Sequence, residues 1–331
     1  MAQAKVGYAA MLEQFGPLEV TELSVKAEEC GFSGVMAADH FQPWVPAQGN
    51  ASFVWNVMTA IAERTKGDVG PGVTCPSFRM HPAIVAQASA TLAAMYPGRH
   101  WLGLGSGEAL NEHILGEYWP ETPERIARMF EAIEIIKKLF GSRGKDVKHE
   151  GKFYKLESTR LWTMPDEPPP IYVATAGPVT AKKTGMFADG LITVGAPEEK
   201  IGMIFDKCRE GAKEAGRDPA KFRFIGQLHL SWAATDEEAL RNAMVEWPNG
   251  GMKFPKQDIK SPLDFEQMAK LVRPEDFQGR MLISADPEKH RQQIQKFIDL
   301  GFDQIYLHNV GRNQAEWIEL FGREVLPKLV A

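Results

Sequence analysis

Short apolar segments alternate with amphipathic segments along almost the whole chain. The apolar segments have the length of buried strands, whereas the segments between them carry apolar residues at helical spacing. The predicted strands span residues 5–10, 33–38, 68–74, 101–105, 171–175, 191–194, 222–233 and 302–308. The predicted helices span residues 17–30, 53–64, 82–95, 122–140, 178–188, 198–215, 236–245, 286–300 and 315–329.

Two stretches interrupt this alternation, at about residues 142–170 and 247–280. In the first, residues 152–156 alternate as a short exposed strand would, and three consecutive prolines at 168–170 close the stretch. The second is rich in Lys, Pro, Gly and Asp. We interpret both as insertions into one domain that spans residues 1–331, because no linker separates two cores.

Eight strands with helices between them predict an α/β fold, a single (β/α)8 TIM barrel with insertions. The main alternative is an open, doubly wound sheet, which usually has a Gly-rich phosphate loop after an early strand. Here Gly103, Gly105 and Gly107 follow the fourth strand and lack the G-x-G-x-x-G spacing. The barrel is therefore the prediction.

Composition narrows the class of protein. The 331 residues are 44% hydrophobic, and the formal net charge of -5 argues against a nucleic-acid partner. Three well-separated cysteines, Cys30, Cys75 and Cys208, have neither disulfide-framework nor metal-ligand spacing, which favours a reducing compartment. No apolar run approaches the ~20 residues that span a bilayer, and no signal peptide is evident. We expect a cytoplasmic protein without a membrane partner.

Polar residues collect where the predicted strands end, which is where barrel enzymes carry their active sites. Asp39, His40 and Trp44 follow the second strand, and Glu108 and Asn111 follow the fourth. The other strand ends carry Thr74-Cys75-Pro76, Thr175-Ala176-Gly177-Pro178, Thr193-Val194-Gly195, His229 and His308-Asn309. An isolated Asp39 would be read as a turn cap and an isolated His40 as a packed imidazole. Several such groups at one end of a barrel indicate a site.

The type of chemistry follows by elimination. No histidine pair has the spacing of a metal site, so no metal is expected, and Ser106 is not in a G-x-S-x-G turn. Gly105, Gly107 and Gly177 would let backbone approach a flat group, although each is equally well a turn residue. Glu108 in a partly apolar mouth would have a raised pKa, unless it simply stabilises a helix N-terminus. The set suits proton and hydride chemistry on a bound organic cofactor.

The chain resembles the luciferase-like superfamily of flavin and deazaflavin enzymes, and within it the dehydrogenases that use coenzyme F420. The resemblance covers essentially the whole chain, and two blocks together are specific for this subgroup: D-H-F-Q-P-W at residues 39–44 and G-E-A-L-N-E at residues 107–112. Further matching segments are Gly7-Tyr8, Glu13-Gln14-Phe15, Phe78-Arg79, Pro82-Ala83-Ile84-Val85-Ala86-Gln87, Tyr96-Pro97-Gly98-Arg99 and Gly177-Pro178.

The resemblance implies hydride transfer from a C–OH carbon of a sugar, sugar phosphate or secondary alcohol to C5 of F420, in an enzyme that is a homodimer by family habit. His40, Trp44 and Glu108 would surround the reacting centre, with His40 and Glu108 sharing the acid and base roles in either order. The implied cofactor-binding residues are Asp39, Val73, Thr74, Cys75, Asn111, Ala176 and Gly177. Val73-Thr74 matches the place where the family has a non-proline cis peptide bond.

The implied substrate pocket departs from the sugar-phosphate enzymes of the family. Their phosphate-holding Thr, Lys, Lys and Arg align with Val194, Pro197, Lys256 and Arg280 here, so two of the four donors are missing. Lys200 and Lys253 are near enough in sequence to compensate. Thr193-Val194 and Cys75 instead resemble the related secondary-alcohol dehydrogenases. A less polar alcohol is therefore at least as good a candidate as a sugar phosphate.

Two other functions remain open at this point. The first is an FMN-dependent monooxygenase of the same superfamily, which would need oxygen and a reductase partner. The second is a ligand-binding barrel without turnover.

Overall fold

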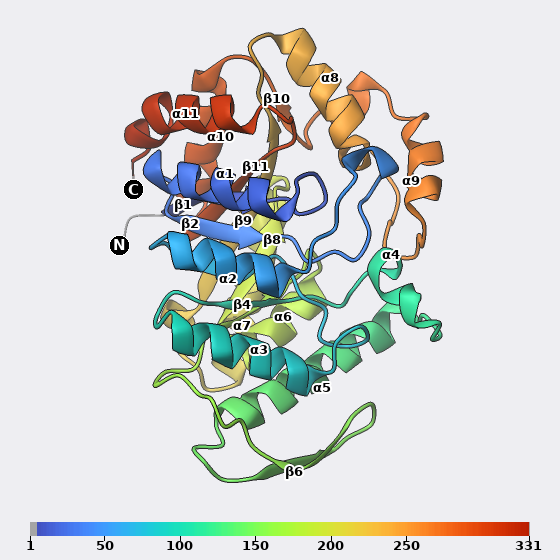
Figure 1. Ribbon diagram of the computed structural model, residues 1–331, viewed down its shortest axis with the longest axis vertical. Coiled ribbons are helices and arrows are strands. Elements are labelled where there is room, and N and C mark those ends of the chain that lie inside the picture. The colour runs from blue at the N-terminus through green and yellow to red at the C-terminus, as the bar shows by residue number, and fades with distance from the viewer. Residues whose placement is uncertain (1–4, 331) are drawn as a thin grey trace.

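Parallel strands form a barrel at the centre of the molecule, as the computed structural model shows for residues 5–330 (Figure 1). The order around the barrel is β3-β2-β1-β11-β9-β8-β7-β4. These strands are β1 (Lys5–Ala10), β2 (Gly34–Ala37), β3 (Asp68–Pro71), β4 (Leu102–Leu104), β7 (Ile171–Ala174), β8 (Gly190–Val194), β9 (Arg223–Ser231) and β11 (Gln304–Asn309). The predicted α/β barrel is thus confirmed.

The ends of this sheet, β3 and β4, meet through single bridges rather than a full ladder. Val69 pairs with His100 and Thr74 with Leu104, both in the parallel sense. The amide of Thr74 donates to the Gly103 carbonyl at 3.0 Å. The barrel is therefore nearly closed, because β3 and β4 lie edge to edge and satisfy part of each other's backbone hydrogen bonding.

One strand of the main sheet escapes the sequence pattern. Strand β10 (Leu282–Ile283) pairs in parallel with Leu230 and Ser231 at the end of β9. Two residues are too few for a hydrophobic period to be recognised. Strand β9 is long enough to pair with β8 along its first half and with β10 at its end.

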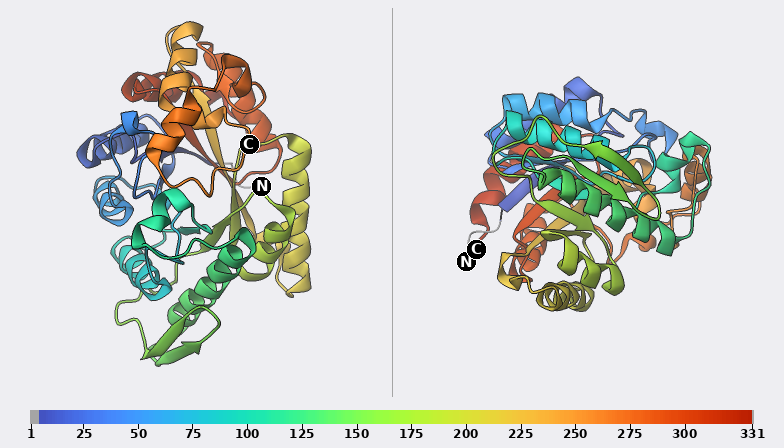
Figure 2. Two further views of the ribbon diagram at one scale, coloured as in Figure 1. Left: turned by 90° about the vertical axis from the view of Figure 1, so that its right-hand side faces the viewer. Right: turned by 90° about the horizontal axis from the view of Figure 1, so that it is seen from below.

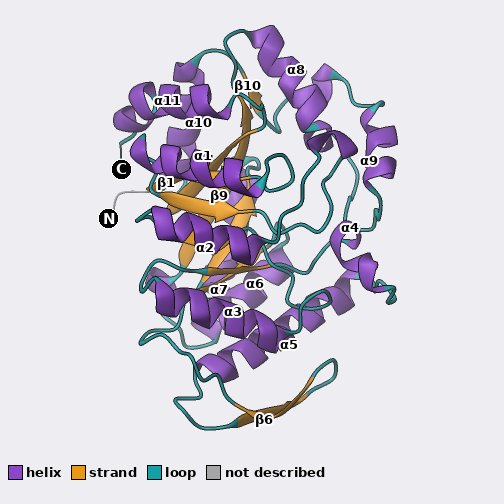
Figure 3. Ribbon diagram, viewed as in Figure 1, coloured by secondary structure: helices purple, strands orange, loops and turns teal. Residues whose placement is uncertain are grey.

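Helices cover the outside of the barrel (Figures 2 and 3). The long ones are α1 (Pro17–Glu29), α2 (Val54–Arg64), α3 (Pro82–Met95), α5 (Thr122–Phe140), α6 (Pro178–Phe187), α7 (Glu198–Glu214), α8 (Asp236–Glu246), α10 (Pro287–Asp299) and α11 (Gln314–Glu324). Proline stands in the first turn of α1, α3, α5, α6 and α10, where its missing N–H costs no helical hydrogen bond.

Alternating residues of β1 separate two apolar clusters. Tyr8 and Ala10 pack outward with the covering helices, whereas Ala9 packs inward among Tyr306 and Trp101. The indole N–H of Trp101 donates to the hydroxyl of Tyr306 at 3.0 Å. These large rings pack inside the barrel toward the amino ends of its strands.

The first insertion forms an antiparallel hairpin, β5 (Val147–Glu150) and β6 (Lys155–Thr159), which projects from the lower end of the molecule in Figure 1. The strand predicted at residues 152–156 is therefore wrong in its bounds. Phe153 and Tyr154 lie at the bend instead, because their amides both donate to the Glu131 carboxylate on α5. A local alternation of residues could not reveal that distant acceptor.

The second insertion contains α9 (Pro262–Ala269) and short 3-10 turns. A further short helix, α4 (Ala109–Glu112), follows β4. The non-proline cis peptide bond joins Gly72 and Val73, one residue before the predicted position at Val73-Thr74.

Candidate functional site

A pocket of about 360 Å³ opens at the carboxyl ends of the barrel strands. Eight of the residues predicted for the site line it: His40, Trp44, Val73, Cys75, Glu108, Asn111, Ala176 and Val194. The other predicted residues, Asp39, Thr74, Gly177, Lys256 and Arg280, are not among the lining residues. The barrel therefore brings most of the predicted groups to one place, and the rest lie behind or beside it.

His40 is held in a defined orientation by the loop after β2. Its Nδ1 lies 3.2 Å from the Gln42 carbonyl, which can only accept, so Nδ1 carries the proton of a neutral ring. Its Nε2 lies 3.5 Å from Oε1 of Glu13. The ring packs 5.1 Å from that of Trp44, centroid to centroid. In the neutral ring Nε2 is thus the free base.

Glu13 is a site residue to which the sequence analysis assigned no role. It follows β1, lines the pocket and is buried. Its Oε2 has no hydrogen-bond partner among the described residues. The rule that strand ends carry the chemistry would have found it, because the first strand ends only three residues earlier in the structure.

Glu108 caps the first turn of α4 with its backbone rather than its side chain. Its carbonyl accepts from the amides of Asn111 and Glu112 at 3.0 and 3.1 Å. The carboxyl group enters the pocket, and burial raises its pKa, while His40 and Lys256 partly oppose the shift. The predicted raised pKa is therefore present, and the group retains its proton further toward neutral pH than an exposed glutamate.

Asn111 joins the two loops that carry this chemistry. Its Oδ1 accepts from the amides of Phe41 and Gln42 at 2.9 and 3.3 Å. In return, the side-chain amide of Gln42 donates to the Leu110 carbonyl at 2.6 Å. The loop after β2 and the loop after β4 are thereby fixed against each other, which sets the position of His40 relative to Glu108.

Asp39 faces protein groups within the barrel wall. Its Oδ1 accepts from Arg79 at 3.0 Å and its Oδ2 from the Thr74 hydroxyl at 2.7 Å. Arg79 also donates to Glu112, through its backbone amide at 2.8 Å and its side chain at 3.3 Å. This buried ion-pair network supports the wall of the pocket. The predicted contact of Asp39 with a cofactor stays a prediction.

Glycines line part of the pocket because side chains would not fit. Gly107 has a φ of +82°, and a Cβ there would lie 2.7 Å from the sulfur of Cys75. A Cβ on Gly105 would lie 2.6 Å from the side chain of Val73. At Gly177, which precedes the first turn of α6, a Cβ would meet nothing within 4 Å. Bare backbone and a helix N-terminus thus border open space.

The cations predicted to bind substrate are already engaged by the second insertion. Lys256 donates to the Asn249 carbonyl at 2.8 Å, and Arg280 donates to the Met252 carbonyl at 3.1 Å. Burial also lowers the pKa of Lys256. Of the two residues that could compensate for the lost donors, Lys253 is paired with Asp276 at 2.7 Å and Lys200 is exposed. Neither lines the pocket.

Four further lining residues received no separate role from the sequence. Thr193 has a buried hydroxyl without a partner among the described residues. Gln227 and His229 come from β9, and Trp247 follows α8. The ring of Trp247 lies 6.1 Å from that of Trp44 and 5.1 Å from that of His229. Thr193 and His229 were among the predicted strand-end residues, whereas Gln227 and Trp247 reach the pocket only because the barrel closes.

Within residues 5–330, no helix has the length and apolar character needed to cross a membrane. In the same residues, no group of three or more His, Cys, Asp and Glu side chains is arranged to hold a metal ion.

The chain matches the family model described as luciferase-like monooxygenase over residues 1–304. It is 35% identical to the F420-dependent glucose-6-phosphate dehydrogenase of Microbacterium testaceum (strain StLB037), over 98% of this chain and 97% of that relative.

Solved structures give the same picture. An F420-dependent secondary alcohol dehydrogenase in complex with an F420–acetone adduct superposes with a TM-score of 0.93, at 32% identity, over 99% of this chain and all of that one (100%). The coenzyme F420-dependent tetrahydromethanopterin reductase from Methanopyrus kandleri gives a TM-score of 0.81 at 24% identity, over 99% and 100% of the two chains, which supports the fold alone.

Proposed function

The chain belongs to the luciferase-like monooxygenase family, and within it we propose that this protein is a coenzyme F420-dependent dehydrogenase that oxidises a secondary alcohol or a sugar. The observation that carries the proposal is the pairing of His40 and Glu108 in one pocket, where Nε2 of His40 can accept a proton and burial raises the pKa of the Glu108 carboxyl. One group can accept a proton and the other can donate one, as hydride transfer from an alcohol requires.

The pocket fits F420 as a ligand. Gly105 and Gly107 leave backbone exposed beside Val73 and Cys75, where a planar ring system can lie. Ala176 and Gly177 stand at the N-terminus of α6, where backbone amides favour an anionic group. When bound, F420 supplies the acceptor for the hydride. Val73, Thr74, Cys75, Asn111, Ala176, Gly177 and Asp39 are the proposed cofactor residues, with Thr74 and Asp39 acting through the wall behind the pocket.

We assign the base role to His40 and the acid role to Glu108. The Nδ1 proton of His40 is committed to Gln42, so Nε2 accepts the hydroxyl proton as the C–H bond gives up its hydride and the C=O bond forms. The resulting imidazolium faces the Glu13 carboxylate. Glu108, whose pKa is raised by burial, would hold the second proton beside the bound cofactor. Trp44 packs on His40 and fixes the ring.

The same pocket favours an alcohol of low charge over a sugar phosphate. Val194 and Pro197 offer no donor, and the cations of Lys256 and Arg280 are tied to backbone carbonyls. A phosphate dianion that loses two charge-assisted hydrogen bonds loses roughly 1.5–3 kcal/mol for each. Val194 lines the pocket, is 44% exposed and can offer a ligand only methyl groups from its side chain.

The test starts with cofactor binding. Purified protein is titrated with oxidised F420 and, separately, with FMN, and bound cofactor is followed by fluorescence. Loss of the oxidised F420 absorbance is then recorded with secondary alcohols, sugars and glucose 6-phosphate. Micromolar binding of F420 with alcohol-dependent reduction supports the proposal. Tight binding of FMN alone, with oxygen consumption, would assign the chain to the monooxygenases instead.

A control separates turnover from mere ligand binding. The His40→Ala and Glu108→Ala variants should bind F420 yet reduce it slowly. If both variants changed only affinity, the pocket would be a binding site without catalysis.

We further propose that the enzyme is a homodimer in the cytoplasm. Cys30, Cys75 and Cys208 are all unpaired thiols, and the last two are buried, which suits a reducing compartment. Light scattering of the purified chain coupled to size exclusion tests the dimer, since a mass of one chain would exclude it.

A further inference from the structure

Two imidazoles lie side by side beneath the pocket. His229 on β9 and His308 on β11 are paired in register, so their side chains leave neighbouring strands at the same level. Their Nδ1 atoms are 2.8 Å apart, which is a hydrogen bond in which one nitrogen donates and the other accepts. The remaining question is which ring carries the proton between them.

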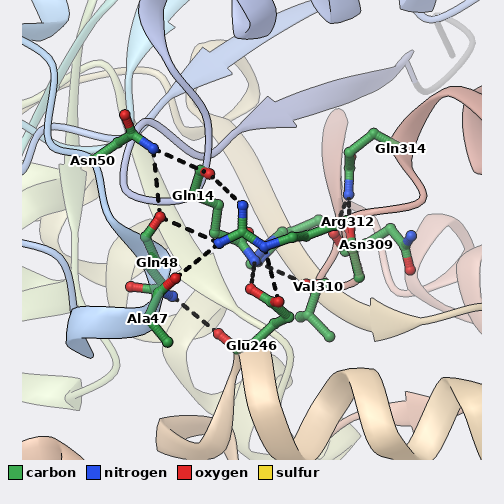
Figure 4. A network of polar contacts seen from close by, with 11 residues as sticks. Gln14, Ala47, Gln48, Asn50, Glu246, Asn309, Val310, Arg312 and Gln314 are labelled. Atoms are coloured by element: carbon green, nitrogen blue, oxygen red, sulfur yellow. Dashed lines mark hydrogen bonds and ion pairs between the residues drawn. The ribbon is translucent and has the colours of Figure 1, made fainter.

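Gln14 decides that question from the far side of His308. Its side-chain nitrogen points at two groups that only accept, the Val310 carbonyl at 2.9 Å and the Glu246 carboxylate at 3.3 Å. Arg312 donates to this carboxylate at 2.9 Å and also to the backbone carbonyl of Gln14. Figure 4 shows these contacts. The amide cannot turn over without placing its oxygen against both acceptors.

The orientation of the Gln14 amide determines which nitrogen carries the proton in His308 and, through it, in His229. Its Oε1 can only accept, so Nε2 of His308, at 3.3 Å, must carry a proton. Burial holds the pKa of His308 well below its ordinary value, so this ring is neutral and its Nδ1 is an acceptor. His229 must then donate from its own Nδ1.

The other nitrogen of His229 is therefore a bare acceptor. The ring lines the pocket, and with Nδ1 engaged by His308, Nε2 at the outer end of the ring is the nitrogen left for a ligand. It has no hydrogen-bond partner among residues 5–330. Burial and the nearby Lys256 lower the pKa of His229 to about 4, so the nitrogen accepts hydrogen bonds without taking the proton at neutral pH.

We propose that His229 is a specificity residue that accepts a hydrogen bond from a second hydroxyl group of the substrate, which makes a diol or polyol the preferred alcohol. The inference rests on the proposed dehydrogenase function and concerns the same pocket. His229 is part-buried in the empty pocket, and a bound substrate would cover its free acceptor. A substrate without a donor at that point would leave the acceptor unpaired, whereas a matching hydroxyl satisfies it. His308 and Gln14 are positioning residues that fix the tautomer.

The tautomer can be measured without any turnover. Protein labelled with 15N-histidine is examined by two-bond proton–nitrogen correlation spectra, with His229→Gln used for assignment. Two other rings serve as internal references. His100 donates from Nδ1 to the Val69 carbonyl at 3.0 Å, and His290 donates from Nε2 to the Ser284 carbonyl at 2.9 Å. We expect His229 to match His100 and His308 to match His290. A proton on Nε2 of His229 would overturn the proposal.

The substrate specificity is measured as kcat/KM for alcohols of equal chain length. Hexan-2-ol is compared with hexane-2,3-diol, hexane-2,4-diol and hexane-2,5-diol, which move the second hydroxyl along the chain. In the wild-type enzyme the best diol should exceed hexan-2-ol in kcat/KM by about tenfold or more. His229→Leu should remove that ratio, and His229→Gln, whose amide oxygen can accept, should keep most of it. An unchanged ratio in His229→Leu would contradict the proposal.

Failure of the proposed function is distinguishable from failure of this inference. If no alcohol reduces F420, the dehydrogenase assignment fails. The inference is then decided by titrating the labelled protein with the diols, since a bound hydroxyl must move the Nε2 resonance of His229, and no movement counts against it.

Discussion

The Nε2 atom of His40 lies 3.5 Å from the Oε1 atom of Glu13, and this contact joins the loops that follow the first two strands of the barrel. Both side chains line the pocket. A carboxylate in this place stabilises the imidazolium that forms when His40 accepts a proton, and it also limits rotation of the ring. Glu13 is therefore part of the proposed base.

The first prediction concerns this pair. Glu13→Gln keeps the shape of the side chain and removes the charge that the imidazolium would face, so kcat/KM for alcohol oxidation should fall by about 10- to 100-fold. The effect should lie mainly in kcat, because the charge pair strengthens in the transition state. Glu237→Gln on the exposed face of α8 is the matched control. A loss confined to KM would assign Glu13 to substrate binding alone.

The second prediction uses the raised pKa of Glu108. As the proposed acid, its replacement in Glu108→Gln should lower kcat by about 10²- to 10⁴-fold. The same substitution should increase the free energy of unfolding at high pH, although it lowers kcat. Burial favours the protonated carboxyl in the folded state, so the wild type loses stability as pH rises from the ordinary value of 4.5 through the raised folded-state pKa.

Urea midpoints at several pH values check that sign. Below pH 4.5 wild type and Glu108→Gln should unfold at similar urea concentrations, because the carboxyl is protonated in both states of the wild type. Near pH 8 the variant should be the more stable protein. A variant less stable than wild type at pH 8 would show that the Glu108 carboxylate is stabilised in the pocket.

The third prediction concerns substrate charge. Val194→Thr combined with Pro197→Lys restores a hydroxyl and an ammonium beside the pocket, and kcat/KM for glucose 6-phosphate should rise by about 10- to 100-fold. The ratio of kcat/KM for uncharged alcohols to kcat/KM for phosphate esters should fall in the same variant. Activity is followed by F420 absorbance, and circular dichroism checks that the overall helix content is unchanged, since Pro197 directly precedes α7. Wild-type turnover of glucose 6-phosphate at micromolar KM would contradict the premise.

The fourth prediction tests the ion-pair network in the barrel wall. Arg79 is the shared partner of Asp39 and Glu112, and all three side chains are nearly inaccessible. Arg79→Met should cost about 3–5 kcal/mol of unfolding free energy, because it leaves two buried carboxylates unpaired. Arg64→Met breaks the exposed pair with Glu22 and should cost at most about 1 kcal/mol. Urea denaturation of both variants gives the comparison, and equal losses would show that the wall relaxes around the carboxylates.

The periodicity of the chain was sufficient for the barrel, because each strand and helix is specified by its own residues. The strand bounds differ by a few residues only, as at β2, which begins at Gly34 rather than residue 33. Patterns failed where a distant group intervened, at the β5–β6 hairpin held by Glu131 and at the two-residue strand β10. The family resemblance placed the cis peptide bond at Val73-Thr74, one residue after its position at Gly72–Val73.

For the site, the sequence by itself determined which residue types stand at the strand ends, since His40, Trp44, Glu108 and Asn111 occupy the pocket that the barrel rule implies. Only the tertiary structure decided their partners. Glu13 meets His40, Asn111 ties two loops together, and Gln14 sets the proton of His308 and hence of His229. The physical reason is that a strand or helix follows from neighbours in sequence, whereas a hydrogen bond across a closed barrel joins residues that only the register of its strands brings together.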